Sequence, residues 1–383
     1  MNAEAVYERW MSIAKRLAMA CLFDAEPAQC AIYRRAIDLA RARNDRANQA
    51  DGEYWLAYVN YALGEALEAK THIDRARALV EEIGGKAFKT QVLATWGQIR
   101  ATACEYADAV QALNEAMSRQ APYRNRPGMM HAYAYSLAAK GMVLGDQGCF
   151  DAAFACFDEA QALIEGPIHP THGSITSMRT AVYLWQGRWE EARLAARANV
   201  EIGERMGSRY ITAMGTALGC YARWQLDRDT PIDDMVRALA WVEGTHQAIW
   251  TSLHFSWLCE MLAELGRHQE ARRAAVWVLK RARKLERLGE SVAYCALASI
   301  PATPSTAGAP ERCFARARAS AEVRESPREL ALIDLKEARW LAAAGDAQGA
   351  AQALEGCRDA FSGMGMYTYA AQAQRLERSL ARG

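Results

Sequence analysis

The chain has 383 residues, enough for two ordinary domains or for one extended repeat domain without a single central core. Apolar residues make up 51% of it, which excludes a disordered chain, and the net charge of +1 gives no overall field that would attract nucleic acid. Alanine, leucine, arginine and glutamate dominate, and all are strong helix formers, so we expect an almost wholly helical protein.

The cysteines and the apolar runs indicate the compartment. The ten cysteines include no C-x-x-C pair and fall on helical apolar positions, as buried free thiols in a reducing cytoplasm do. Residues 17–23 resemble a short signal core, but acidic residues flank them and their periodicity is helical. No apolar run reaches membrane-spanning length. We therefore expect a soluble cytoplasmic protein with no membrane association, cofactor or metal.

The clearest local pattern lies at residues 141–160. Its order is Gly-x-aromatic-x-x-Ala-x-x-x-Phe-x-x-Ala, carried by Gly148, Phe150, Ala153, Phe157 and Ala160. A glycine can end one helix in the left-handed conformation, and alanines on one face allow the next helix to approach closely. The pattern therefore predicts two antiparallel helices joined by a short turn.

This unit repeats along the chain with a spacing of 37 to 44 residues between its turn positions, which are Asp24, Gly64, Cys104, Gly148, Gly187, Asp227, Gly266, Gly308 and Gly345. Such regular spacing predicts nine helix-turn-helix units, with atypical units toward the ends.

Taken in order, the predicted helix pairs are 5–22 with 28–43, 47–63 with 65–82, 88–103 with 106–119, 129–146 with 150–164, and 174–186 with 189–206. In the fifth pair, Thr171 or Ser174 can cap the first helix. The sixth unit has Thr230 and Pro231 where its second helix should begin, and the seventh pair is 249–265 with 268–288.

The stretch 299–310 is the one linker-like segment, and its three prolines shorten the eighth unit. We expect a main solenoid over 1–300, a hinge or loop over 301–310, and the last repeats over 311–383. A ninth pair is predicted at 327–344 and 347–361, followed by a capping helix at 367–380.

The pattern at 141–160 resembles the tetratricopeptide signature, although its period is nearer 40 than 34 residues. The resemblance implies an all-α superhelix with first helices on the concave face. The segments 183–192, 208–215, 281–290 and 326–329 are also similar to the carboxy-terminal repeats of bacterial class III adenylate cyclases fused to signalling ATPases. The chain has no G-x-x-x-x-G-K-[ST] phosphate loop, so neither catalytic activity is implied.

Counting back from each turn position predicts the side chains of the concave groove. They are unusually aromatic, and large rings with a polar atom suit the binding of a peptide or partner helix. The alternative is that these rings pack against the next unit. The predicted residues are Tyr54, Trp55, Tyr58, Tyr61, Gln98, Tyr135, Met142, Met178, Trp185, Tyr221, Trp224, Trp257 and Glu260.

Other polar patterns favour ordinary structural roles. His169 and His172 could pair at a metal, but a loop role is favoured because the sequence shows no third ligand nearby. A basic stretch is predicted on a convex, solvent-facing helix without interleaved aromatic residues, which does not favour nucleic acid. Its members are Arg272, Arg273, Lys280, Arg281, Arg283, Lys284 and Arg287.

No serine, cysteine or histidine pattern indicates a nucleophile with its base, so no catalytic residue is predicted. The leading hypothesis is a non-catalytic scaffold that binds a protein or peptide in its concave groove, in bacterial signalling by resemblance. The alternative is a regulatory module that encloses a small apolar or aromatic ligand and controls an ATPase or cyclase.

Overall fold

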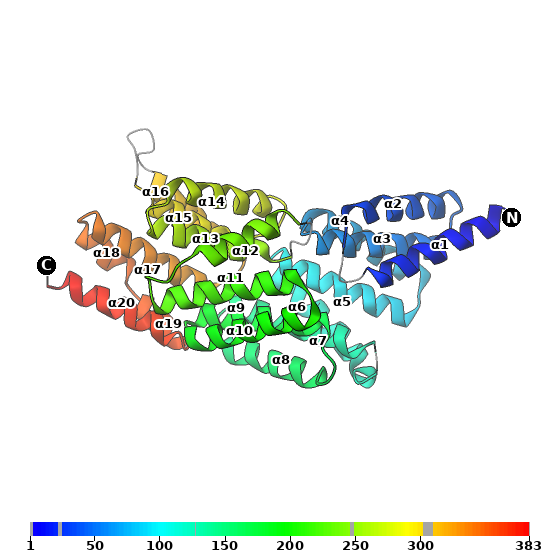
Figure 1. The fold of residues 1–383 in the computed structure, drawn as a ribbon, viewed down its shortest axis with the longest axis horizontal. Helices are drawn as coiled ribbons and strands as arrows, with labels where there is room; N and C mark the ends of the chain where they lie inside the picture. The colour runs from blue at the N-terminus through cyan, green and yellow to red at the C-terminus, as the bar shows by residue number, and fades with distance from the viewer. Residues whose placement is uncertain (1–2, 22–24, 127, 246–248, 302–308, 383) are drawn as a thin grey trace.

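The computed structural model describes residues 3–21, 25–126, 128–245, 249–301 and 309–382, and over these ranges it is an all-α solenoid without a strand. Figure 1 shows helical hairpins arranged along one long axis, with the two chain ends at opposite ends of the molecule. The predicted fold class is confirmed. No helix in the described ranges is long and apolar enough to cross a membrane.

The hairpins follow the predicted order. Their first helices are α1 (Ala3–Ala20), α3 (Arg46–Ala62), α5 (Lys86–Thr102), α7 (Met130–Asp146), α9 (Pro170–Gln186), α11 (Arg209–Leu226), α13 (Thr251–Glu264), α15 (Glu290–Ser299) and α17 (Pro327–Ala343). Their second helices are α2 (Pro27–Ala42), α4 (Ala66–Ile83), α6 (Tyr106–Gln120), α8 (Phe150–Leu163), α10 (Trp189–Met206), α12 (Asp233–Glu243), α14 (His268–Ala282), α16 (Ala309–Val323) and α18 (Ala347–Ala353). The chain ends with α19 (Cys357–Gly363) and α20 (Tyr367–Leu380).

The turn between α7 and α8 shows why the repeat needs its small residues. Gly148 has a φ of 79°, in the left-handed region that glycine adopts without a steric penalty. On the helix before it, a Cβ added to Gly141 would lie 3.0 Å from the Phe157 ring and 3.1 Å from the Ala153 carbonyl oxygen. Cys104 holds the equivalent turn position in the third unit with a φ of 62°. Seven of the predicted turn positions therefore mark helix ends, and the other two, Asp24 and Gly308, lie outside the described residues.

The core extends along the solenoid instead of forming one centre. One cluster of buried apolar side chains runs from Ala101 to Ala373, and a second one runs from Ala14 to Ala116. All ten cysteines are free thiols, as the sequence predicts, but only six of them are buried, and Cys149 is exposed.

Several predicted boundaries are wrong. Helix α9 begins at Pro170 instead of Ser174, because the His169 side chain caps it. Helix α14 ends at Ala282 instead of 288, because the chain turns through Leu285, whose φ is 73°. The predicted helix 347–361 is split into α18 and α19 at Gly356, which has a φ of 73°. Within the predicted hinge, residues 302–308 lie outside the described ranges, and 309–310 are helical.

The superhelix closes on itself at three places, the first of which joins the second and seventh units. The Lys284 carbonyl accepts a hydrogen bond from the Leu67 backbone N–H (3.1 Å), and the Lys284 ammonium lies 2.7 Å from a Glu65 carboxylate oxygen. Arg281 donates to the Gly64 carbonyl across 217 positions of sequence. The prediction that these two basic residues face only solvent is therefore wrong.

The second contact joins the turn of the fourth unit to the connection between α16 and α17. Asp146, at the end of α7, is fully buried and pairs with Arg324 (2.8 Å) and with Arg328. Ser326 donates to the Asp146 carbonyl (2.6 Å), and Tyr106 donates to the Asp146 carboxylate (2.6 Å). This buried polar network ties together two parts of the chain that lie far apart in sequence.

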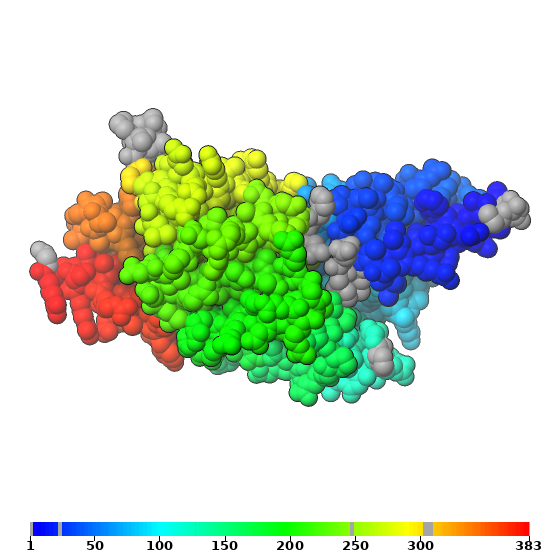
Figure 2. Space-filling model, in the orientation of Figure 1, coloured from blue at the N-terminus to red at the C-terminus, as the bar shows by residue number. Residues whose placement is uncertain are grey.

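The third contact joins the fifth unit to the final helix. Thr368 donates to the Gly187 carbonyl (2.9 Å), and Tyr369 donates to the Leu184 carbonyl (3.4 Å). Figure 2 shows the resulting solid body, in which the green, yellow and orange segments are packed side by side. The inner faces of the middle and last units are thus brought against one another.

Candidate binding site on the inner face

The predicted groove residues lie inside the superhelix. Apart from Met178, twelve residues are predicted to line the groove. Ten of them are buried, and Tyr58 and Tyr135 are half-buried. Met178 is also buried. The rings thus pack within the protein in this conformation, as the alternative interpretation of the sequence expects, and their contact with a partner stays a prediction.

The first group of these residues lies in the N-terminal units. The ring of Tyr54 meets those of Trp55 and Phe88 edge to face, at centroid distances of 5.0 and 5.7 Å. The Tyr61 hydroxyl lies 3.1 Å from that of Tyr135, four helices further on. Burial raises the pKa of both hydroxyls, so both remain protonated and act as neutral hydrogen-bonding groups.

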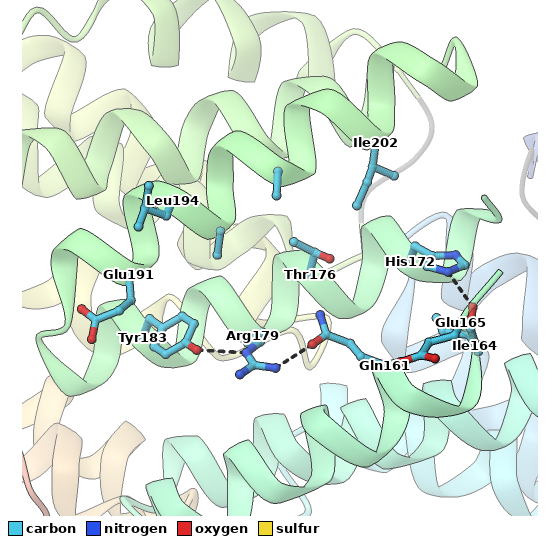
Figure 3. Close-up of a pocket in the computed structure, with 12 residues that line it drawn as sticks. Gln161, Ile164, Glu165, His172, Thr176, Arg179, Tyr183, Glu191, Leu194 and Ile202 are labelled. Carbon is cyan, nitrogen blue, oxygen red and sulfur yellow. Dashed lines mark hydrogen bonds between the residues drawn. The ribbon is translucent and has the colours of Figure 1, made fainter. Parts of the chain in front are cut away.

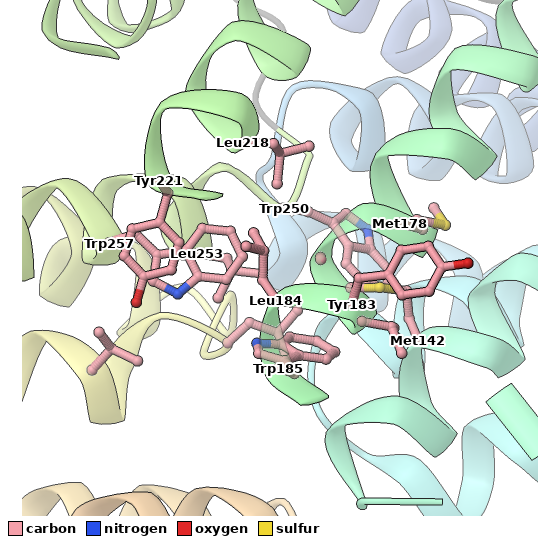
Figure 4. Packing of buried hydrophobic residues seen from close by; sticks show 14 of the residues in the cluster. Met142, Met178, Tyr183, Leu184, Trp185, Leu218, Tyr221, Trp250, Leu253 and Trp257 are labelled. Atoms are coloured by element: carbon pink, nitrogen blue, oxygen red, sulfur yellow. The ribbon is translucent and has the colours of Figure 1, made fainter. Parts of the chain in front are cut away.

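The second group lies in the middle of the chain and forms a stacked aromatic wall (Figure 4). The rings of Tyr221 and Trp257 are 4.8 Å apart and nearly parallel, at 13°. Tyr221 donates a hydrogen bond of 2.8 Å to Glu260, whose other carboxylate oxygen lies 2.6 Å from the Lys336 ammonium. In the same region, the Arg328 guanidinium lies over the ring of Trp185, 4.6 Å from the ring centre. Trp185, Tyr221 and Trp257 form this aromatic wall. It contacts two cations of α17, Arg328 through Trp185 and Lys336 through Glu260.

A cavity of about 40 Å³ lies beside this aromatic wall, between α9, α11, α13, α17 and α20. Its buried side holds Trp185, Tyr221, Trp257 and Glu260, and its solvent side holds Arg228, Glu264, Arg339 and Gln372. One water occupies roughly 30 Å³ in the liquid, so the cavity has room for water and not for an aromatic molecule. We refer to the four solvent-side residues as the mouth.

Two arginines of the mouth are only loosely paired. Arg228 Nε lies 3.9 Å from Glu264 Oε2, at the limit of an ion pair, while its guanidinium stacks 3.6 Å from the centre of Trp224. It also donates to two neutral acceptors, the Trp224 carbonyl (3.3 Å) and the Gln225 side chain (3.2 Å). Arg339 donates to Gln372, a neutral partner. Burial lowers the pKa of Arg339, and burial together with the charge of Glu260 raises the pKa of Glu264. Among the described residues, therefore, neither arginine makes an ion pair shorter than 3.9 Å.

The sequence prediction missed Arg339 and Lys336, although its own counting rule reaches them. Tyr221 and Glu260 stand six positions before their turn positions at 227 and 266, and Arg339 stands six before Gly345. Lys336 likewise matches Trp257, nine before the turn. Applying the count to the ninth unit would have placed both cations on the inner face.

The histidines have structural roles. His169 accepts a hydrogen bond from the Thr171 backbone N–H (3.2 Å), and the His172 ring lies 2.8 Å from the Ile164 carbonyl oxygen. His131 stacks on His169 at 3.7 Å, and burial lowers the pKa of His169 to about 4. In the part of the chain that the structure describes, no group of three His, Cys, Asp or Glu side chains could hold a metal ion.

Comparison with known proteins yields structural likeness only. No family model and no curated protein matches this chain. The solved structure of yeast Tom70 aligns over 97% of this chain and 93% of its own, with 9% identity and a TM-score of 0.33. The TPR domain of P58(IPK) aligns over 97% of this chain and 98% of its own, with 14% identity and a TM-score of 0.23.

Proposed function

We propose that this chain is a non-catalytic helical-repeat scaffold that binds an acidic segment of a protein partner on its inner face. The single observation that carries the proposal is the pair of loosely held arginines, Arg228 and Arg339, at the mouth. A guanidinium forms its strongest hydrogen bonds with carboxylates, often through two parallel N–H donors. A partner carboxylate would replace the neutral contact to Gln372 with a charged one.

The aromatic wall behind the mouth supports the same assignment. Trp185, Tyr221 and Trp257 supply rigid apolar surface next to the two arginines. Rings and arginines together are the residue types that dominate the energy of peptide and protein interfaces. In the present conformation the rings are covered, so the arginines would make the first contact, and the rings would contribute only where the superhelix loosens.

The ligand-sensing alternative has less support. A small-molecule site usually encloses roughly 300–1,000 Å³, whereas the cavity beside the rings measures about 40 Å³. A place in bacterial signalling, in the cytoplasm, rests on the sequence resemblance alone, and we keep it as part of the proposal.

Two labelled peptides test the function. One alternates glutamate and serine, and the other has glutamine in place of every glutamate, so only charge distinguishes them. We expect fluorescence anisotropy to show binding of the acidic peptide alone. The double variant Arg228→Gln/Arg339→Gln should weaken this binding about fivefold, the effect of losing about 1 kcal/mol of partly exposed ion pairing.

The matched control is Arg272→Gln/Arg273→Gln, which removes the same charge from exposed positions of α14. It should leave the affinity for the acidic peptide unchanged. Equal affinity for the two peptides would refute the proposed site because binding would then not depend on the partner's carboxylates. An equal loss in the two double variants would also refute it, because attraction would then reflect net charge alone.

A further inference from the structure

An apolar stripe lies unpartnered on the outer face of α1. Val6, Trp10 and Ile13 are 48%, 39% and 55% exposed, and the half-buried Leu17 continues the same face one turn later. The adjacent face of α1 packs into the protein through Tyr7, Met11, Ala14 and Ala18. Positions i, i+4, i+7 and i+11 share one side of a helix, so these four residues form a continuous surface, the α1 stripe.

A groove of about 540 Å³ lies in the fourth and fifth units, between α8 and α10 with α9 as its floor (Figure 3). Its α10 wall is apolar and is made of Leu194, Ala195, Ala198 and Ile202, of which Leu194 is 53% exposed. The central polar residue of the floor, Arg179, is already satisfied by Asp158 (2.7 Å) and Gln161 (2.6 Å). The groove is therefore an apolar channel whose floor needs no further partner.

The two surfaces match in length. The α1 stripe spans residues 6–17, and the groove follows α10 over residues 191–202. At a rise of 1.5 Å per residue, each covers about 16 Å of helix. Of the groove's α10 residues, Glu191, Ala195, Ala198 and Ile202 repeat the i, i+4, i+7, i+11 spacing of the α1 stripe, so the side chains of one helix can seat between those of the other.

The two surfaces also match in charge. The exposed residues Arg9 and Arg16 border one edge of the α1 stripe, and within the described ranges neither forms an ion pair. The groove has a carboxylate at each end, Glu165 and Glu191, as Figure 3 shows. Glu165 is exposed and, among the described residues, makes no ion pair, while Glu191 contacts only Arg188 at 2.9 Å. The one basic edge of the α1 stripe is thus complementary in charge to the two acidic ends of the groove.

We propose that the α1 stripe of one copy docks into the α8–α10 groove of a second copy, so that the chain assembles head to tail. Because the two surfaces lie on different parts of the molecule, each copy would keep one free stripe and one free groove. Such a heterologous contact produces rings or open filaments and not a closed two-fold dimer. Pairing α1 with α1 around a two-fold axis is disfavoured, since it would place Arg9 and Arg16 beside their own copies.

Sedimentation at increasing protein concentration tests the assembly. The wild-type chain should show a weight-average mass that rises at least twofold between low micromolar and several hundred micromolar protein. Trp10→Glu and Leu194→Glu should each stay monomeric, because each puts a charge in the centre of one surface. Val276→Glu, at a position on α14 that is 53% exposed like Leu194, should assemble as the wild type does.

Mixing the two blocked variants distinguishes head-to-tail docking from every symmetric contact. Trp10→Glu keeps an intact groove and Leu194→Glu keeps an intact stripe, so the mixture should form a one-to-one dimer that grows no further. In addition, Arg9→Glu/Arg16→Glu should abolish assembly, and Glu165→Arg/Glu191→Arg in the same chain should restore it. A monomeric wild type, or a mixture that stays monomeric, would overturn the proposal.

Discussion

Arg324 and Asp146 stand 178 positions apart in the sequence and form an ion pair of 2.8 Å in which neither side chain touches solvent. Burial opposes ionisation of the carboxyl, but the charges of Arg324 and Arg328 outweigh it and lower the pKa of Asp146. The pair therefore stays charged, and it locks the turn of α7 onto the α16–α17 connection.

Replacing Asp146 with asparagine should strongly destabilise the fold, because the buried guanidiniums of Arg324 and Arg328 would keep only the carboxylate of Glu329. Breaking a buried pair from one side typically costs about 3–5 kcal/mol. Urea unfolding followed by circular dichroism measures the change. Asp234→Asn removes an exposed carboxylate that pairs with Arg237, and it should change the free energy of unfolding by less than about 0.5 kcal/mol. Similar losses in the two variants would show that the buried pair has no special role.

A buried histidine should make stability depend on pH. Burial lowers the pKa of His254 to about 4, from 6.5 in an unfolded chain. Between these values the unfolded chain binds a proton that the folded chain does not, so stability rises with pH from about 4 to 6.5. Across this range the free energy of unfolding should increase by about 3 kcal/mol.

His254→Gln should reduce the slope of this part of the pH profile, to which His169 also contributes, and His268→Gln, on α14, should leave the slope unchanged. Urea midpoints measured from pH 4 to pH 7 provide the comparison. If His254→Gln retains the slope of the wild type, another group controls stability in this range.

Two turn glycines should differ in their tolerance of alanine. Gly266 has a φ of 73° and open space around it, so Gly266→Ala should cost only the left-handed conformation, about 1–2 kcal/mol. Gly148 has a similar φ of 79°, but an added Cβ would lie 2.5 Å from Met364 Sδ. Gly148→Ala should therefore lower the melting temperature by more than Gly266→Ala does, and equal shifts would contradict the close approach of α19.

Ring substitutions on the inner face should act on stability before they act on binding. Trp257 is 3% exposed, and truncating a buried tryptophan to alanine costs about 3–5 kcal/mol. Trp257→Ala should therefore unfold at lower urea concentration, whereas Tyr367→Ala, at a residue that is 72% exposed, should behave as the wild type. An unshifted midpoint for Trp257→Ala would mean that the stacked aromatic wall is not formed in solution.

The repeat architecture could be predicted because it depends on local sequence patterns. A left-handed turn residue and, five positions later, an alanine recur every 37 to 44 residues, and each acts on neighbours within a few turns of helix. The helix ends that were wrong depend on groups that carry no such signal. His169 replaces the usual Ser or Thr as a cap, and Leu285 adopts a conformation normally reserved for glycine.

The closure of the superhelix could not be predicted from these patterns. Its contacts join Gly64 with Arg281, Asp146 with Arg324, and Gly187 with Thr368, across 217, 178 and 181 positions. No periodicity relates such pairs, since each depends on the summed twist of several units. The same closure explains why predicted aromatic residues such as Trp185, Tyr221 and Trp257 are covered.

The buried ion pair of Asp146 also has a consequence for synthesis of the chain. Ribosomes add about 5–20 residues per second, so Arg324 emerges on the order of 10 to 35 s after Asp146. During that time the Asp146 carboxylate has neither Arg324 nor Arg328 to pair with, and the first units form a solenoid that is not yet closed. A newly made chain therefore passes through a stage in which its aromatic inner face is open, and folding factors or the partner itself can reach surfaces that the finished protein covers.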